Sequence, residues 1–488
     1  MRSQSDSTFS SNRRGKITGV SRGHISEVAL MKAQTWKDIS VQEVCDLMTN
    51  PYGGVEFTQP SGELNIKSEP LLESVLSTGN VRSAWDRVKA NRGAPGIDKI
   101  SIESFPELTR VNWLNIKSSI LEGKYKPLPV RRTEIPKSNG ESRSLGIPTV
   151  QDRLIQQSMC QKLVPIFDPD FSAYSFGFRP NRSAHDAVRR INEGILSGYT
   201  WAVDIDLSKF FDRVNHDLLM ARVSRKVKDK RVLKLIGRYL RAGVSVDGVV
   251  SKTGIGVPQG GPLSPLLANI MLDDLDKEIE RRGHYFSRYA DDFVILVNSK
   301  EAGERVMNSL RRFIEKKLKL VVNEEKSKVV PVGEANFLGF RFTRGKIRWT
   351  DKSFDKFKHN LRYLTRRNWG VSIEYRIKKI NQYIRGWMGY YGLSYYYTPL
   401  PKLDEWLRRR IRMCIWKQWR YSRTKVRELM KLGVRKIDSL RMAASSKSYW
   451  RLSKTFATNL GMNLKWFESN LGLLSIKQRW ITFHYPNG

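Results

Sequence analysis

Apolar positions change their spacing several times along the chain, and each change predicts a different kind of element. From Leu71 onward the apolar residues follow helical spacing, until residues 91–96 interrupt them with loop composition. Between residues 201 and 342, short runs rich in β-branched and aromatic residues alternate with helical stretches such as 217–239 and 302–319. This alternation predicts an α+β domain, with helices on one face of a sheet whose other face is open.

Strand-like runs are no longer seen after residue 350. Six large apolar residues are then spaced by three and four, as on one face of a helix: Ile373, Ile377, Ile380, Ile384, Trp387 and Tyr391. A separate helical module is expected from about Ser422, and no internal repeat is found. Residues 1–66 are rich in Ser, Gly, Asn and charge, which predicts a poorly ordered extension without chemistry of its own.

The charge balance points to a polyanionic partner. The 488 residues include 86 Lys and Arg against 48 Asp and Glu, which is a formal charge of +38. Such an excess is typical of proteins that bind nucleic acid. It is strong in residues 351–420, which hold 17 Lys and Arg against 5 Asp and Glu. Charge alone leaves a ribosomal or architectural protein as an open alternative.

Cysteine spacing and hydropathy argue against a disulfide-rich, zinc-binding, secreted or membrane protein. Cys45, Cys160 and Cys414 lie far apart and form no CxxC pair, so the sequence indicates neither a disulfide framework nor a zinc knuckle. The N-terminus lacks the apolar core of a signal peptide, and no run of about 18 apolar residues occurs. We expect a soluble protein that works in a reducing compartment without a membrane partner.

Two acidic motifs predict a metal-dependent active site. In WAVDIDLSKFFDRVNH, period-two alternation places Asp204 and Asp206 on one face of a strand. In FSRYADDFVILV, apolar stretches flank Asp291 and Asp292, which predicts a β-hairpin tip beside that strand. Clustered carboxylates repel one another unless a cation lies between them, and oxygen ligands suit Mg²⁺. Two such ions about 3.5 to 4 Å apart would support nucleotidyl transfer, whereas a turn with two solvated acids is the alternative.

Further motifs surround these two in a definite order from about Leu71 to the C-terminus. They are IPKSNGESRSLGIPTVQDRLIQQ, SAYSFGFRPNRSAHDAV, VDIDLSKFFDRVNH, GVPQGGPLSPLLANIMLDDLD, RYADDFVIL, NEEKSKV, FLGFRF and RIKKINQYIRGWMGYYG. The series resembles that of group II intron-encoded reverse transcriptases and maturases. In that family the first motif belongs to the fingers, the second contacts the template, the next three form the palm, and the last belongs to the thumb or maturase region.

The resemblance implies a right-hand polymerase of the α+β class. Its expected segments follow the extension at 1–66 and are 67–195 for the fingers, 196–345 for the palm, 346–421 for the helical thumb or maturase domain, and 422–488 for a small helical DNA-binding-like region.

By the same resemblance, Asp206, Asp291 and Asp292 are the catalytic residues and metal ligands. They are expected to hold two Mg²⁺ ions, for which Mn²⁺ can substitute. Asp206 is assigned because the family pattern places an aromatic residue five positions later, here Phe211. Asp204 is then a supporting neighbour and not a ligand.

The resemblance also implies contacts with the incoming nucleotide. The ring of Phe211 is expected to lie beneath the ribose and to exclude a 2′-hydroxyl, and the alternative is that Phe210 and Phe211 are both core aromatics. Because consecutive residues near a strand end tend to face opposite ways, we expect Phe210 to be the buried one. The remaining substrate-binding positions are Lys137, Arg143, Gln259 and Lys326. A solvated loop charge is the alternative for Lys137, and a purely structural turn is the alternative for Gln259. Pro262 suits the first turn of the helix that follows.

Contacts with template and intron RNA are expected at seven positions. These are Arg179, Asn181, Arg362, Arg366, Arg367, Lys378 and Lys379. Tyr390 and Tyr391 lie among basic residues, and either stacking on nucleic acid or packing in the core fits their helical spacing.

The implied function is RNA-directed DNA synthesis from dNTPs on an RNA template with a DNA primer, together with binding and splicing of the group II intron RNA and mobility by target-primed reverse transcription. Two alternatives stay open: a splicing cofactor that no longer polymerises, and a domesticated reverse transcriptase for defence or repair. No Cys follows Ser422, so we expect no endonuclease of the paired Cys and His type. The primer would then come from elsewhere, such as a nascent strand at a replication fork, and we expect a bacterial cytoplasmic location.

Overall fold

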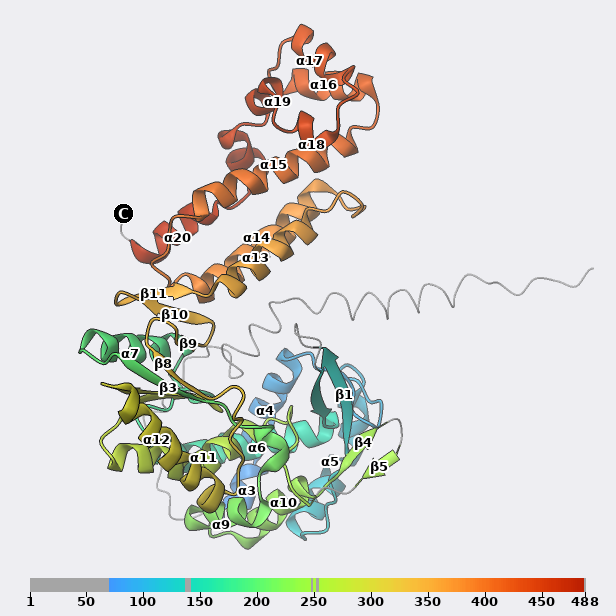
Figure 1. Cartoon of the computed structure of the whole chain (residues 1–488). Helices are drawn as coiled ribbons and strands as arrows, with labels where there is room; N and C mark the ends of the chain where they lie inside the picture. The colour runs from blue at the N-terminus through green and yellow to red at the C-terminus, as the bar shows by residue number, and fades with distance from the viewer. Residues whose placement is uncertain (1–69, 137–141, 247–248, 252–253, 487–488) are drawn as a thin grey trace, which may run out of the picture. The chain divides into compact units, whose positions relative to one another are not determined.

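The computed structural model describes residues 70–136, 142–246, 249–251 and 254–486. The extension expected at residues 1–66 and the substrate residue Lys137 therefore lie outside the described residues. Helices and strands alternate in the order shown in Figure 1, and the predicted α+β class is confirmed.

The first part of the described chain combines helices with a small mixed sheet. The helices are α3 (Leu71–Val75), α4 (Thr78–Ala90), α5 (Phe105–Leu121), α6 (Val150–Phe167) and α7 (Ala184–Leu196). The sheet has the order β2-β1-β4-β5, with bounds β1 (Val130–Pro136), β2 (Ser142–Ile147), β4 (Val244–Val246) and β5 (Val249–Ser251). Thr149 caps α6 by accepting a hydrogen bond from the backbone of Asp152.

A four-stranded antiparallel sheet forms the palm. Its order is β6-β7-β3-β8, with bounds β3 (Trp201–Ile205), β6 (Tyr285–Tyr289), β7 (Asp292–Val297) and β8 (Lys328–Pro331). The helices of this region are α8 (Phe210–Arg213), α9 (His216–Lys226), α10 (Lys230–Leu240), α11 (Ser264–Arg281) and α12 (Lys300–Phe313), which a π-helical turn at Ile314–Leu318 extends.

Both faces of the palm sheet are covered over part of their length. Val203 and Ile205 point into the main core, where α11 and α12 pack. Ala202 and Leu296 point to the opposite face and pack with α7 and with a small sheet that follows β8. The expectation of one open face is therefore wrong at this end of the sheet, because apolar residues distant in sequence cover it.

The chain after the palm begins with this small antiparallel sheet and continues as helices. The strands are β9 (Asn336–Phe337), β10 (Phe340–Thr343) and β11 (Lys346–Trp349), followed by α13 (Asp351–Leu364), α14 (Ile373–Tyr391) and α15 (Leu400–Gln418). The helical spacing seen in the sequence is confirmed in α14, where Ile377, Ile380, Ile384 and Trp387 are buried. Trp387 stacks on Phe357 of α13 with the ring centroids 4.0 Å apart.

The C-terminal segment consists of short helices and ends against the thumb. The helices are α16 (Ser422–Lys431), α17 (Lys436–Ala443), α18 (Tyr449–Leu452), α19 (Phe456–Gly461) and α20 (Ile476–His484). Ile476 and Trp480 of α20 belong to the hydrophobic core of α13 to α15, and the Asp404 carboxylate in α15 accepts hydrogen bonds at the start of α20. The end of the segment therefore packs into the core of the thumb. None of the described helices is both long and apolar enough to cross a membrane.

Candidate active site

The register of the central palm strands brings two of the predicted carboxylates together. In the antiparallel pair of β3 and β7, Asp204 lies opposite Val294 and Ile205 lies opposite Phe293. Asp206 follows Ile205 and Asp292 precedes Phe293, so the same register, continued by one position past the end of β3, would place these two residues opposite each other. Directly opposed residues point to the same face, with Cβ atoms about 4.5 to 5.5 Å apart. Asp206 and Asp292 therefore share a face at one end of the sheet.

Asp291 lies in the two-residue turn between β6 and β7. Tyr289 pairs with Asp292, so Ala290 and Asp291 make up the turn, and the predicted hairpin tip is confirmed. Ala290 is buried and has a φ of +58°, which lies in the left-handed region. Two-residue hairpin turns need a positive φ at the first position, and an alanine adopts it at a cost of about 1 to 2 kcal/mol.

The backbone of Asp206 is held by the segment before β8. The Asp206 amide donates to the hydroxyl of Ser327 at 3.0 Å, and its carbonyl accepts from the amide of Asn323 at 2.8 Å. Both residues belong to the NEEKSKV motif, in which Lys326, and not Ser327, was predicted from the sequence to bind substrate. Ser327, which lies between Lys326 and Lys328, could not be recognised from the sequence, because its partner Asp206 is more than a hundred positions away.

Asp204 has a different environment from Asp206. It pairs in register with Lys328 of β8 and is half-buried. Burial raises the pKa of Asp204 to about 6, although Lys328 lowers it, and the nearby charge of Asp206 adds to the rise. Asp204 therefore holds its proton more readily than an ordinary aspartate, and its role as a supporting neighbour stays a prediction.

The carboxylates provide the right ligand type for magnesium. Within the described residues, no three His, Cys, Asp or Glu side chains converge closely enough to hold an ion by themselves. Mg²⁺ is usually held by one or two carboxylates, with water and substrate phosphates completing its shell. Oxygen ligands from Asp206, Asp291 and Asp292 fit an ion that is completed by the substrate.

Phe210 and Phe211, two consecutive aromatic residues that follow β3, lie in different environments. Phe210 is 3% exposed and belongs to the main core, so its predicted burial is confirmed. Phe211 is half-buried at the edge of that core, with its ring centroid 5.1 Å from that of Phe210. Its carbonyl accepts a hydrogen bond from Val257 at 2.7 Å, which ties it to the segment that leads to Gln259.

The Gln259 turn is anchored to the small mixed sheet. Its carbonyl accepts from the amide of Gly146 at 2.7 Å. Gly260 has a φ of +123°, and a Cβ there would lie 2.5 Å from the carbonyl oxygen of Gly146, so only glycine fits. Helix α11 begins at Ser264, and Pro265, not Pro262 as we expected, stands in its first turn.

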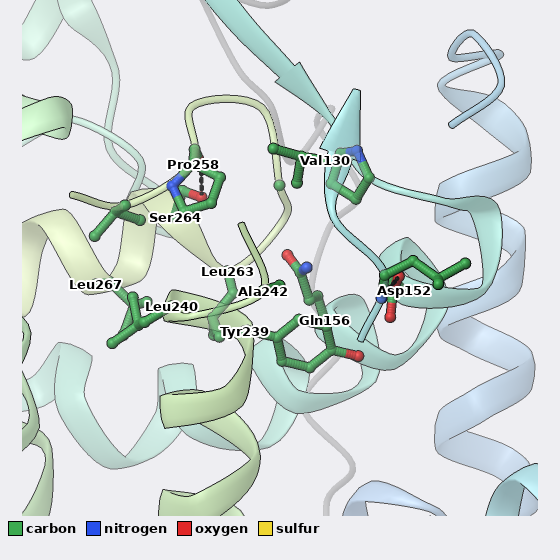
Figure 2. A pocket seen from close by; sticks show the side chains of 14 residues that line it. Val130, Asp152, Gln156, Tyr239, Leu240, Ala242, Pro258, Leu263, Ser264 and Leu267 are labelled. Carbon is green, nitrogen blue, oxygen red and sulfur yellow. Dashed lines mark hydrogen bonds between the residues drawn. The ribbon is translucent and has the colours of Figure 1, made fainter. Parts of the chain in front are cut away.

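A small cavity of about 20 Å³ lies under this turn. Figure 2 shows Gln156 and Tyr239 between Asp152 on one side and the Pro258–Ser264 turn on the other. Asp152 is buried and accepts hydrogen bonds from Tyr125 and Thr149, both at 2.7 Å. Asp152 was missed in the sequence, because nothing in VQDRL marks it as buried.

The other predicted substrate residues are only partly described. Arg143 lies in β2, where its backbone pairs with that of Ile135 in β1. Lys326 is exposed and immediately precedes Ser327, which holds the Asp206 backbone. Lys326 therefore adjoins the residue that holds the Asp206 backbone. The binding of the triphosphate by Lys137 stays a prediction.

The structure corrects the prediction for Arg179. Its side chain is 3% exposed and forms an ion pair with Asp168 at 2.7 Å. Its guanidinium also donates to the carbonyls of Ser172, Ser175 and Asp168. A group enclosed in this way does not reach template, and Arg179 braces its own loop instead. Asn181 is exposed, with a φ of +55°, and its contact with the template stays a prediction.

The predicted basic residues of the thumb differ in exposure. Arg362, Arg367 and Lys378 are exposed, whereas Arg366 and Lys379 are half-buried. Arg366 lies over the ring of Tyr363, 3.8 Å from its centroid. The rings of Tyr390 and Tyr391 contact Phe340, so these two tyrosines pack in the core and do not form a stacking surface.

Comparison with known proteins identifies the two main parts of the chain. Residues 135–342 match the family model of reverse transcriptases, described as RNA-dependent DNA polymerases. Residues 354–433 match the model of the group II intron maturase-specific domain, which extends past the boundary that we expected near Ser422. The first model covers every carboxylate of the candidate site, and the second covers the basic helices.

Individual relatives agree with these models. Protein YkfC of Escherichia coli is 33% identical, over 60% of this chain and 86% of YkfC. The group II intron-encoded protein LtrA of Lactococcus lactis is 33% identical, over 53% of this chain and 54% of LtrA. The putative COX1/OXI3 intron 2 protein of Saccharomyces cerevisiae is 28% identical, over 53% of this chain and 37% of that protein. The chain thus spans about half the length of LtrA.

The reverse transcriptase model covers the palm sheet, and the maturase-specific model covers the basic helices that follow it in the chain. Members of this family depend on a divalent metal ion and bind nucleic acid, in agreement with the carboxylates and the charge of +38. The chain belongs to the family of group II intron-encoded reverse transcriptases and maturases.

Proposed function

We propose that this chain copies RNA into DNA at the end of β3 and β7, with Asp206, Asp291 and Asp292 as the metal-binding carboxylates. The observation that carries the proposal is the strand register, which makes Asp206 and Asp292 a same-face pair beside the hairpin turn that holds Asp291. A pair of oxygen-rich side chains on a rigid sheet is suited to hold metal ions for phosphoryl transfer.

In this proposal, Asp206, Asp291 and Asp292 would hold two Mg²⁺ ions, for which Mn²⁺ can substitute. The bound ions would supply the positive charge for activating the primer 3′-hydroxyl and stabilising the leaving pyrophosphate. The protein positions the other partners. Phe211 lies beneath the ribose of the incoming dNTP, and Gln259 approaches it on a turn that Gly260 allows to come close. Arg143 and Lys137 bind the triphosphate, and Lys326 binds substrate or primer beside the strand end.

The basic helices are proposed to bind RNA. Arg362, Arg367 and Lys378 are exposed on α13, on the segment after it and on α14, within the part that matches the maturase-specific domain. We propose that these residues, with Arg366 and Lys379, contact the intron RNA and assist its splicing. Target-primed synthesis at a DNA site would then support mobility, with the segment at 422–488 contacting DNA.

Extension of a DNA primer on an RNA template by the purified chain tests the proposed activity. Asp206→Asn should lose extension, since it removes a metal-binding charge with little change in shape. Asp204→Asn should retain much of the activity, because Asp204 pairs with Lys328 and is proposed only to support its neighbour. If Asp204→Asn is inactive and Asp206→Asn is active, the metal site uses Asp204 instead of Asp206.

Two rival functions predict different outcomes. A splicing cofactor without polymerase activity would promote splicing of the intron RNA but extend no primer. A domesticated reverse transcriptase would extend primers but lack an intron RNA around its coding region. Both measurements, together with the sequence that flanks the gene, separate these cases.

A further inference from the structure

Behind the hairpin turn lies a fully buried ion pair. Arg288 of β6 and Asp276 of α11 both have side chains with 0% exposure. The guanidinium donates to both carboxylate oxygens, from Nε at 2.7 Å and from a terminal nitrogen at 2.5 Å. Replacing a buried pair of this kind with apolar residues is often neutral or stabilising, so stability alone does not explain its presence.

The remaining donors of Arg288 reach the turn itself. Its other terminal nitrogen donates to the carbonyl oxygen of Ala290 at 2.8 Å and to the side-chain oxygen of Asn269 at 3.0 Å. The Asn269 amide nitrogen in turn donates to the carbonyl of Gly177 at 2.9 Å. One guanidinium therefore connects helix α11, strand β6 and the residue that directly precedes Asp291.

The loop that contains Gly177 also contacts the turn. A Cβ added to Gly177 would lie 2.2 Å from the amide nitrogen of Ala290, so the two backbones are in contact. The backbone of Arg288 pairs with this loop, since its amide donates to Tyr174 at 2.9 Å and its carbonyl accepts from Phe176 at 2.8 Å. The loop is the one that Arg179 braces.

From these contacts we propose that Arg288 is a positioning residue, which, with Asp276 and Asn269, holds the left-handed conformation of Ala290 and thereby sets the direction of the Asp291 and Asp292 carboxylates. The proposal rests on the function proposed above. A residue with a positive φ persists only where its surroundings hold it. Displacing a reacting group by about 1 Å can cost a hundredfold in rate, so small changes in this turn matter.

Arg288→Lys tests the proposal, because lysine retains a charge facing Asp276 but cannot bond the carboxylate, Asn269 and Ala290 together. The control is Arg376→Lys. Arg376 is 1% exposed and its guanidinium donates only to the carbonyls of Leu364, Arg366 and Trp369, in the thumb. Each variant is assayed for primer extension against dNTP and Mg²⁺ concentration, for thermal unfolding, and for Mn²⁺ binding by electron paramagnetic resonance.

For Arg288→Lys we expect kcat to fall about ten- to a hundredfold, a higher Mg²⁺ requirement, weaker Mn²⁺ binding, and a nearly unchanged KM for dNTP. Arg376→Lys should lower thermal stability but leave the Mg²⁺ requirement and the Mn²⁺ affinity unchanged. Asn269→Ala, which keeps the ion pair and removes the side chain that links Arg288 to Gly177, should shift metal binding in the same direction as Arg288→Lys.

Equal Mg²⁺ requirement and equal Mn²⁺ affinity in the parent, Arg288→Lys and Asn269→Ala would overturn the positioning role and leave a purely structural ion pair. Failure of the proposed function is a different result, since the parent chain itself would then extend no primer. Mn²⁺ binding still tests the positioning role in that case. If Arg288→Lys does not fold, Asn269→Ala decides.

Discussion

Asp206 and Asp292 each adjoin the last pair of strands β3 and β7, in which Ile205 lies opposite Phe293. They are 86 positions apart in the sequence, and their proximity follows from the antiparallel pairing of two buried strands. Asp291 joins them from the turn. The chemistry proposed for the chain depends on this relationship, and so does the first prediction.

Replacing both Asp291 and Asp292 with Ala should abolish primer extension and leave RNA affinity nearly intact, because these acids are proposed to bind metal ions and not phosphate. Extension assays and filter binding measure the two effects. The control is the double variant Glu301→Ala with Glu304→Ala, which changes the net charge equally at exposed positions of α12. Continued DNA synthesis in the Asp variant would refute the metal assignment, and loss of RNA binding would indicate a structural role.

RNA affinity should depend steeply on salt, and the thumb should account for part of that dependence. Each neutralised phosphate contributes about 0.7 to 0.9 to the slope of log affinity against log salt. Combining Arg362→Gln, Arg367→Gln and Lys378→Gln should therefore reduce the slope by roughly 2 to 3 units.

The matched control for that experiment is Lys228→Gln with Lys230→Gln and Lys234→Gln, at exposed positions just before and within α10. It removes the same number of charges and should leave the slope unchanged. A slope that falls equally in both triple variants would mean that the RNA responds to total charge and not to a site on the thumb.

Phe211 should determine sugar selection. Overlap of a 2′-hydroxyl with the ring edge would cost about 1 to 3 kcal/mol, which corresponds to roughly ten- to a hundredfold discrimination. Phe211→Val should raise ribonucleotide incorporation by that factor while DNA synthesis persists, as single-nucleotide kinetics can measure. Phe210→Ala should instead destabilise the fold by about 3 to 5 kcal/mol, because Phe210 is 3% exposed. A Phe211 variant that rejects ribonucleotides as well as the parent would disprove the steric role.

Arg179→Ala should reduce stability more than it reduces RNA affinity. Removing one partner of a buried ion pair typically costs about 3 to 5 kcal/mol, and Asp168 would lose its partner. Urea unfolding measures the effect, with Arg189→Ala as the control, since Arg189 is exposed and pairs with Asp186 on the surface. Unchanged stability combined with weak RNA binding would restore the contact role that the sequence suggested.

Much of this molecule was predictable because its signals are local. The period-two runs of the palm, the helical spacing in α14 and the acids of the hairpin turn each need only a few neighbouring residues, and the structure confirms them. The family resemblance has the same origin, since the motifs are short and their order is readable. Charge likewise indicated a nucleic-acid partner without any knowledge of the fold.

Tertiary structure decided what local patterns do not contain. Arg179 stands in a basic motif and was expected to face template, but its donors meet carbonyl and carboxylate oxygens that only the folded loop brings around it. Ser327 holds the backbone of Asp206 from a distant part of the chain, and Arg288 connects Ala290 to Asp276 and Asn269 of α11. A side chain's partners are set by the packing of distant segments, so a polar residue's exposure cannot be read from its neighbours in sequence.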